Sequence, residues 1–265
     1  DPDYFGTLQA DSVGANVFFA PGQTLSMKNP VVTVSQNTAL MGFTPVTSTT
    51  LDGLKSHGYL ALEFAIEQWA MPTFKASVLL PDEPISLCVP IAEGNINLEA
   101  QVKGFVEIAG DDTLQVIKGD LVVDSGTFSF EIPALPDWFK EPLATSTDIT
   151  ITTGKNALFA YPSIRTPIVQ AVFNDNQKVR ILYDAVDETL GFEGRLAFRS
   201  GEIYYIQKNF YITEGGLSFS PGMSDPESLN AFIDLRARIQ EFDASGNKVD
   251  IFLVLENSSL DNIKP

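Results

Sequence analysis

Apolar and polar residues alternate with a period of two along most of the chain, and this pattern predicts β-strands. From Ile233 to Gln240 apolar side chains alternate with charged or polar ones, and Val249–Leu255 repeats the pattern. The polar, glycine-containing segment Phe242–Lys248 between these runs predicts a hairpin connection. Leu60–Glu67 and Val179–Tyr183 alternate in the same way. The chain is therefore predicted to be all-β and to form a meander.

A glycine-containing pattern recurs along the chain. Gly194–Tyr205 matches Gly119–Phe130 position for position, and a third copy spans Lys208–Phe219. A weaker copy, with one residue inserted, spans Gly6–Gly14. Each copy predicts a strand, then a polar residue and a glycine at a turn or bulge that requires positive φ, then a second strand. Such units cannot bury their own apolar side, so we expect them to stack in an elongated sheet.

The apolar positions of the copies correspond, which predicts that they share one face of the sheet. Polar residues such as Asp120 and Arg195 are then expected to face water. The C-terminal hairpin adds its own apolar side to the same strip. The residues predicted to line this strip, as a groove for lipid, are Leu121, Val123, Phe128, Phe130, Leu196, Phe198, Ile203, Tyr205, Phe210, Ile212, Leu217, Phe219, Ile233, Leu235, Val249, Ile251 and Leu253.

A proline-rich stretch interrupts the repeats. It holds three prolines between Pro133 and Pro142, and prolines do not fit a central strand. Further on, Asp225–Glu227 fits the start of one helical turn. The predicted organisation is an N-terminal β segment at 1–132, a Pro-rich linker or short cap at 133–144 and a C-terminal β segment at 145–265.

The formal net charge is −17, from 34 acidic and 17 basic residues. Such a surface repels phosphate backbones, which argues against nucleic-acid binding. It also disfavours adsorption to anionic membranes by charge alone, and solubility is the simplest interpretation of the acidic surface. No apolar run reaches the roughly 18 residues of a membrane-spanning helix. Because the chain begins at Asp1 without a methionine, we expect it to be a segment of a larger protein.

Patterns for catalysis and metal binding are missing. His57, expected in an exposed loop, and Cys88, expected to be buried, are single residues and too few for a triad or a zinc site. Nucleophile-elbow and phosphate-loop motifs are also missing. The acidic groups Asp111–Asp112, Asp184–Glu188 and Asp243–Asn247 lack EF-hand spacing, so only incidental calcium binding is considered. Spacing cannot reveal a pair of glycosidase carboxylates, and otherwise the chain is predicted to be non-catalytic and free of cofactors.

The C-terminal third resembles the conserved C-terminal domain of the TamB family, within the AsmA-like group. The ordered glycines and aromatic residues of Glu193–Phe219 carry the resemblance, together with Asp225-Pro226 and the alternating strand Ala231–Arg238 that follows. The ending Ser259–Pro265 also resembles the end of that family's strand. The similarity covers about residues 165–265, and the preceding residues are compatible with it.

The resemblance implies an elongated, twisted, U-shaped ("taco") antiparallel sheet with little helix and a continuous apolar groove. It implies a periplasmic part of an inner-membrane-anchored protein that transports phospholipid and supports outer-membrane biogenesis. The expected partners are phospholipid acyl chains and an outer-membrane barrel of the TamA or BamA type, as in the translocation and assembly module that serves protein secretion. Two other functions stay open. One is an assembly factor that binds outer-membrane β segments by strand addition, and the other is a carbohydrate-binding or adhesive β-sandwich.

Overall fold

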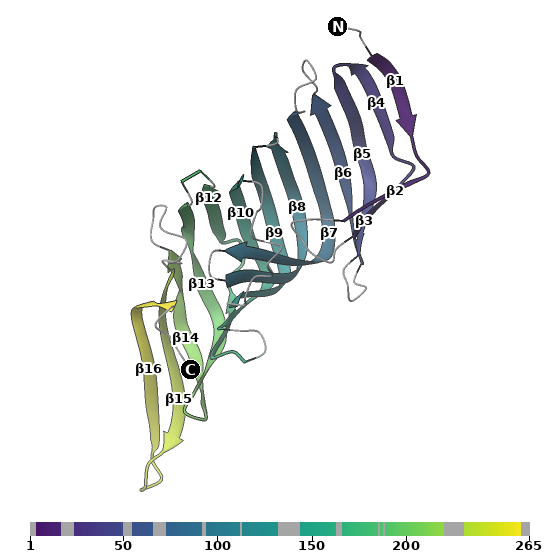
Figure 1. Ribbon diagram of the computed structural model, residues 1–265. Helices are drawn as coiled ribbons and strands as arrows, with labels where there is room; N and C mark the ends of the chain where they lie inside the picture. The colour runs from purple at the N-terminus through teal and green to yellow at the C-terminus, as the bar shows by residue number, and fades with distance from the viewer. Residues whose placement is uncertain are drawn as a thin grey trace.

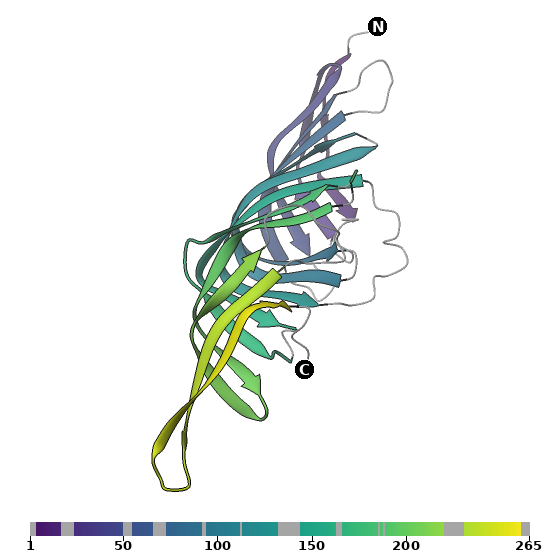
Figure 2. The same ribbon diagram turned by 90° about the vertical axis from the view of Figure 1, so that its left-hand side faces the viewer.

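The computed structural model describes residues 4–16, 24–49, 55–65, 73–91, 94–111, 113–131, 144–162, 166–184, 186–187, 189–219 and 231–260. Sixteen strands of these residues form one elongated, twisted sheet, with the N-terminal strands at one end and the C-terminal strands at the other (Figures 1 and 2). No α-helix occurs among the described residues. The prediction of an all-β chain is confirmed.

The strands follow the chain in order along most of the sheet. Those of the N-terminal half are β1 (Tyr4–Gln9), β2 (Ser12–Asn16), β3 (Thr24–Lys28), β4 (Val31–Gln36), β5 (Thr38–Thr49), β6 (Lys55–Ala65), β7 (Thr73–Ile91), β8 (Gly94–Gly110) and β9 (Leu114–Glu131). Those of the C-terminal half are β10 (Ala144–Tyr161), β11 (Val169–Phe173), β12 (Lys178–Asp184), β13 (Thr189–Tyr205), β14 (Lys208–Phe219), β15 (Ala231–Phe242) and β16 (Lys248–Ser259).

At two positions in the sheet, two short strands lie end to end in the place of one long strand. β11 and β12 both lie between β10 and β13, antiparallel to each, and occupy successive stretches of the same gap. β3 and β4 likewise share β5 as a partner, while β2 and β1 continue the sheet beside them. The interruptions divide a strand into two paired stretches without dividing the sheet.

β9 and β10 pair in parallel, whereas the other strand pairs are antiparallel. Ala144 pairs with Leu114, so β10 begins at the same end of the sheet as β9. The expectation of a purely antiparallel sheet is therefore wrong at this one pair. The predicted Pro-rich linker or cap lies outside the described residues apart from Ala144, and so does the helical turn predicted at Asp225–Glu227.

The glycine-containing repeats are long strands with bulges, and the turn expected at each glycine is not formed. β9, β13 and β14 run without a break through Gly126, Gly201 and Gly215. The register shifts by one residue just before these glycines. Each glycine therefore follows a β-bulge, which the sequence analysis gives as the other possibility besides a turn. Gly126 and Gly215 have φ of 153°, which favours glycine. Each extra residue bends the strand and reverses which of the following residues face inward.

The β15–β16 hairpin confirms the connection predicted at Phe242–Lys248. Asp243 closes its turn, since its Oδ1 accepts hydrogen bonds from the backbone N–H groups of Ser245 and Asn247, at 2.8 Å each. These bonds, led by the one from Asn247, hold the pKa of Asp243 below its ordinary value. Asp111 caps a turn in the same way, and hydrogen bonds from Thr113 lower the pKa of its carboxyl. Both carboxylates therefore serve local turns.

Candidate functional site

One face of the sheet is apolar across strand after strand, and we call it the inner face. Leu196 of β13 lies opposite Leu217 of β14, which lies opposite Ile233 of β15. Ile203 lies opposite Phe210 in the same way. The register therefore places the apolar sets of successive strands on one side, and the charged residues between them, including Arg195 and Asp120, are exposed. The bulges make this possible, because they reverse the direction of the residues that follow.

The structure places the predicted lining residues in three groups. Tyr205, Val249 and Ile251 are exposed, and Leu253 is partly buried against the core. Phe128 and Phe130 pair with Leu98 and Ile96 through their backbones, while their side chains lie outside the described residues. The other eleven belong to one buried cluster, each at most 9% exposed: Leu121, Val123, Leu196, Phe198, Ile203, Phe210, Ile212, Leu217, Phe219, Ile233 and Leu235.

The same cluster contains aromatic residues that are not among the predicted lining residues. The Phe159 and Phe173 rings pack against the Phe198 ring, with centroids 5.9 and 5.6 Å apart. The Phe192 ring stacks on the Phe219 ring at 5.3 Å. Phe159 and Phe173 lie on β10 and β11, outside the glycine repeats, so only the ordinary period-two alternation could have identified them.

The C-terminal half of the inner face is closed over. The Tyr161 hydroxyl of β10 donates a hydrogen bond of 2.7 Å to the carbonyl of Leu260, the residue directly after β16. β16 is the fifth strand along the sheet from β10, so the two would lie ~24 Å apart if the sheet were flat. A tyrosine cannot reach that far, so the C-terminal strands curl toward their apolar side. Leu260 is buried as a result.

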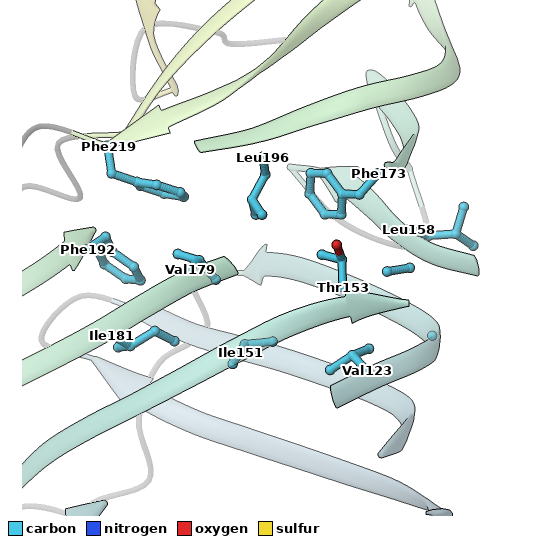
Figure 3. Close-up of a pocket in the computed structure, with 12 residues that line it drawn as sticks. Val123, Ile151, Thr153, Leu158, Phe173, Val179, Ile181, Phe192, Leu196 and Phe219 are labelled. Carbon is cyan, nitrogen blue, oxygen red and sulfur yellow. The ribbon is translucent and has the colours of Figure 1, made fainter. Parts of the chain in front are cut away.

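A small cavity remains inside this closed half (Figure 3). Its walls are almost wholly apolar, and side chains from β9 to β14 contribute to them. The volume is about 30 Å³, which is room for one water molecule and far too little for an acyl chain. The lining residues labelled in Figure 3 are Val123, Ile151, Thr153, Leu158, Phe173, Val179, Ile181, Phe192, Leu196 and Phe219.

The inner face is more open over the N-terminal strands. A second buried cluster consists of Met27, Met41 and Val46, with leucines and a valine packed against it. Beside it, apolar residues of β6 to β8 point to the inner face and are only half-buried. Toward the β1 edge, Leu8 lies on the same face and is 66% exposed. The half-buried residues are Leu60, Leu62, Val78, Leu80, Val106 and Ile108.

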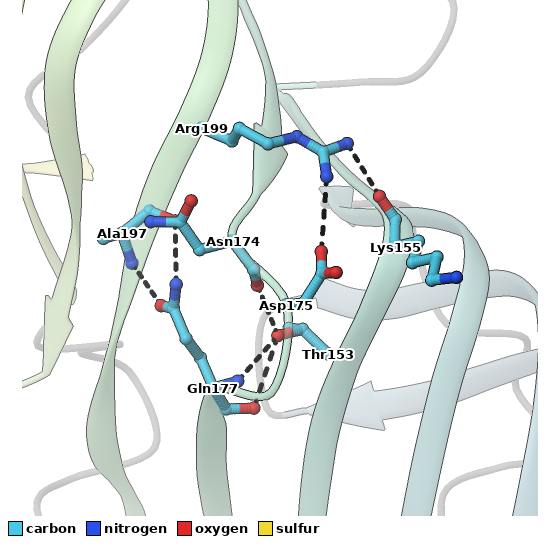
Figure 4. A network of polar contacts seen from close by, with 7 residues as sticks. All are labelled: Thr153, Lys155, Asn174, Asp175, Gln177, Ala197 and Arg199. Atoms are coloured by element: carbon cyan, nitrogen blue, oxygen red, sulfur yellow. Dashed lines mark hydrogen bonds and ion pairs between the residues drawn. The ribbon is translucent and has the colours of Figure 1, made fainter.

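A polar network fills the interruption between β11 and β12 (Figure 4). The Thr153 hydroxyl donates to the Asn174 carbonyl at 2.7 Å and accepts from the Gln177 N–H at 3.0 Å. The Gln177 side-chain amide accepts from the N–H of Ala197 and donates to its carbonyl. In this way one side chain supplies the donor and the acceptor that an uninterrupted strand would have presented to β13.

We expect Gln177→Ala to lower the free energy of unfolding by about 1–2 kcal/mol, because the N–H of Ala197 loses its partner, while the Ala197 carbonyl keeps the hydrogen bond from the Asn174 N–H. Chemical denaturation is the measurement. Gln170→Ala, an exposed glutamine on β11, is the control and should change stability by less than about 0.5 kcal/mol. Equal effects of the two substitutions would contradict this role for Gln177.

The opposite, outer face carries ion pairs between neighbouring strands. Arg180 of β12 holds Asp148 of β10 through two hydrogen bonds of 2.7 and 2.9 Å and also contacts Glu193 of β13. The hydrogen bonds from Arg180 hold the pKa of Asp148 below its ordinary value. Because these groups are partly exposed, each pair contributes at most about 1 kcal/mol. The outer face is thus polar and solvated here.

The candidate chemical residues do not gather into a site. His57 lies within β6, opposite Thr47, and not in the predicted loop, although it is exposed as expected. Cys88 lies on β7 opposite Asn97, and its side chain is outside the described residues. Within the described part of the chain, no three histidine, cysteine or acidic residues cluster as metal ligands. No helix of the described residues is long and apolar enough to span a membrane.

Comparison with known proteins gives no relative: no family model, no curated protein and no solved structure matches this chain.

Proposed function

We propose that this chain is a lipid-binding segment of a periplasmic protein like those of the TamB family, and that it acts without catalysis. In this proposal its inner face shields phospholipid acyl chains on their way to the outer membrane, with an outer-membrane barrel of the TamA or BamA type as a partner. The observation that carries the proposal is the apolar face, which is shared by many strands and only partly buried over β6 to β8. Exposing an acyl chain to water costs about 0.8 kcal/mol per methylene, so an extended apolar surface lowers that barrier.

The path of the chain at β9 supports a trough. A straight strand of 18 residues extends ~56 Å. The chain between Glu131 and Ala144 has thirteen peptide links and reaches at most ~47 Å, yet Ala144 lies beside Leu114 at the other end of β9. β9 must therefore bend, as the curvature of the long strands in Figure 2 illustrates. A sheet of long strands bent toward the apolar side has the U-shaped section that the proposal requires.

The two halves of the inner face would have different tasks. The C-terminal half is packed, with a cavity of about 30 Å³, so its side chains hold the sheet in its curled form. The half-buried residues of β6 to β8 offer area that an acyl chain can cover without displacing a packed core. We therefore assign lipid contact to this open part, which includes Leu62, Val78 and Val106.

Val78→Asp is expected to weaken binding of a fluorescent fatty acid to delipidated protein by at least tenfold. A charge on the inner face would repel the acyl chain and require its own hydration. Binding is measured by fluorescence titration, and mass spectrometry of the untreated preparation identifies phospholipid that co-purifies. Leu79→Asp is a matched control, because Leu79 is the next residue and points to the outer face. It should change the affinity by less than twofold.

Two outcomes would remove the proposal. One is a Val78→Asp variant that is folded by circular dichroism and binds as well as the unchanged chain. The other is an unchanged chain that carries no lipid and binds none. The buried Phe198 and Phe219 suit this test less well, since an aspartate at either position would disturb the packed core.

One observation favours the second candidate, an assembly factor that acts by strand addition. The edge formed by β1 and β2 carries no charged side chain, and Asp11 and Lys28 are the only charged residues in 4–49. Natural sheets usually protect an edge with charges or prolines, whereas an uncharged edge accepts a further strand. A lipid-free preparation that captures a peptide from an outer-membrane β-strand would favour this candidate.

A further inference from the structure

Exposed apolar side chains gather at the C-terminal end of the sheet. The β13–β14 and β15–β16 hairpins lie side by side there and project beyond the other strands (Figures 1 and 2). We call their exposed apolar residues the hairpin-tip patch. Other exposed large apolar side chains lie in the N-terminal half, between Phe5 and Phe105. Between Phe105 and Tyr204, Val186 is the one such side chain among the described residues, so the patch is separate from those of the N-terminal half. Its members nearest the two turns are Tyr204, Tyr205, Ile206, Tyr211, Phe242 and Val249, and Ile251, Phe252 and Val254 continue it along β16.

The tip of the β13–β14 hairpin has a residue that the local backbone disfavours. Ile206 and Gln207 form its two-residue turn, and their φ angles are 47° and 59°. Asparagine and glycine suit such a turn, whereas a β-branched residue at positive φ is strained. Ile206 is also 74% exposed, so it gains little burial in return. A strained, exposed isoleucine indicates a contact with something outside the chain.

The surroundings of the patch suit a lipid surface. Lys208 forms an ion pair with Glu241, and Arg238 lies 3.8 Å from Asp250, so these four charges near the patch are paired. Next to the tip, Glu202–Tyr205 of β13 pair with Lys208–Tyr211 of β14, which limits the backbone groups that must lose water. Tyrosine rings have an apolar body and a polar hydroxyl, a combination that is enriched at the level of lipid headgroups.

We propose that the hairpin-tip patch docks this chain onto a zwitterionic bilayer surface, with Ile206 entering the headgroup layer. The inference goes beyond the proposed function, since it concerns where the chain contacts a membrane, whereas the lipid contact proposed above lies on β6 to β8. The net charge of −17 sets the lipid class, because an acidic chain is repelled by anionic headgroups. A protruding tip fits a deformable bilayer better than it fits a rigid protein surface.

The test is flotation with phosphatidylcholine vesicles in a density gradient. We expect the double substitution Ile206→Asn and Gln207→Gly to reduce vesicle binding at least tenfold, since the apolar tip is removed. The same change gives the turn its preferred residues and should raise the melting temperature, so lost binding cannot reflect unfolding. Val186→Ser is the matched control, because Val186 is also 74% exposed but lies in a turn capped by Asp184. It should bind as the unchanged chain does.

Several results would overturn the inference: no flotation of the unchanged chain, equal flotation of the Asn-Gly variant, or tighter binding to phosphatidylglycerol vesicles than to phosphatidylcholine. Fatty-acid binding is measured on the same samples and should stay within twofold in the Asn-Gly variant. If fatty acid binds and vesicles do not, the docking surface is wrong and the groove stands. If vesicles bind through the tip and fatty acid does not, the groove is wrong and the docking surface stands.

Discussion

Leu217→Ala is expected to lower the free energy of unfolding by about 3 kcal/mol. Leu217 is fully buried in β14, between Leu196 of β13 and Ile233 of β15. Removing its side chain leaves a cavity that the surrounding strands cannot fill, since they are held in register on both sides. Urea denaturation with a shared m-value gives the measurement.

Leu8→Ala is the informative control for this substitution. Leu8 has the same side chain on the same inner face, but it lies on β1 and is 66% exposed. Its loss should cost less than about 1 kcal/mol, because little buried area disappears. The difference between the two leucines measures how far the inner face is closed at each end of the sheet. Equal losses would mean that the closed C-terminal half contributes no special stability.

The sequence predicted the strands and the shared apolar face well. Period-two alternation is a local property, so the β15–β16 hairpin and the inward direction of Leu196, Phe210 and Leu217 followed from it directly. All eleven predicted residues that are buried lie in one cluster, which agrees with the expected common face. Whether that face binds lipid remains a proposal.

The turn predicted at each glycine of the repeats is not formed, and the numbering of the inward residues shows why. In β13 the inward residues are Leu196 and Phe198 before the glycine, but Ile203 and Tyr205 after it. The inward positions change from even to odd numbers, as one extra residue in a continuous strand requires. A turn at the glycine would also allow the inward positions to change from even to odd numbers. The local pattern therefore does not distinguish a turn from a bulge.

The closing of the C-terminal half could not be derived from the sequence. It depends on contacts between residues far apart, such as that of Tyr161 with Leu260, and on the parallel pairing of β9 with β10. Neither residue carries a local signal of its partner. The curl is the summed effect of strand twist and successive bulges, and alternation along one strand does not contain it.

Gly215→Ala is expected to lower the free energy of unfolding by about 3 kcal/mol, because two effects combine. At φ of 153° an alanine is strained, which costs about 1–3 kcal/mol. Its Cβ would also lie 2.5 Å from the Asp234 carbonyl oxygen and 2.7 Å from the Leu235 Cβ, so β14 and β15 would have to separate at the bulge. Thermal unfolding followed by circular dichroism measures the loss.

Gly42→Ala provides the comparison, since Gly42 also lies at a register shift but nothing stands within 4 Å of its missing Cβ. That substitution should be neutral or slightly stabilising, because alanine restricts the unfolded chain more than glycine does. If both alanines are tolerated, β14 does not need the bulge at Gly215. Its two halves would then have no reason to keep both Ile212 and Leu217 on the inner face, and the continuity of the apolar surface would need another explanation.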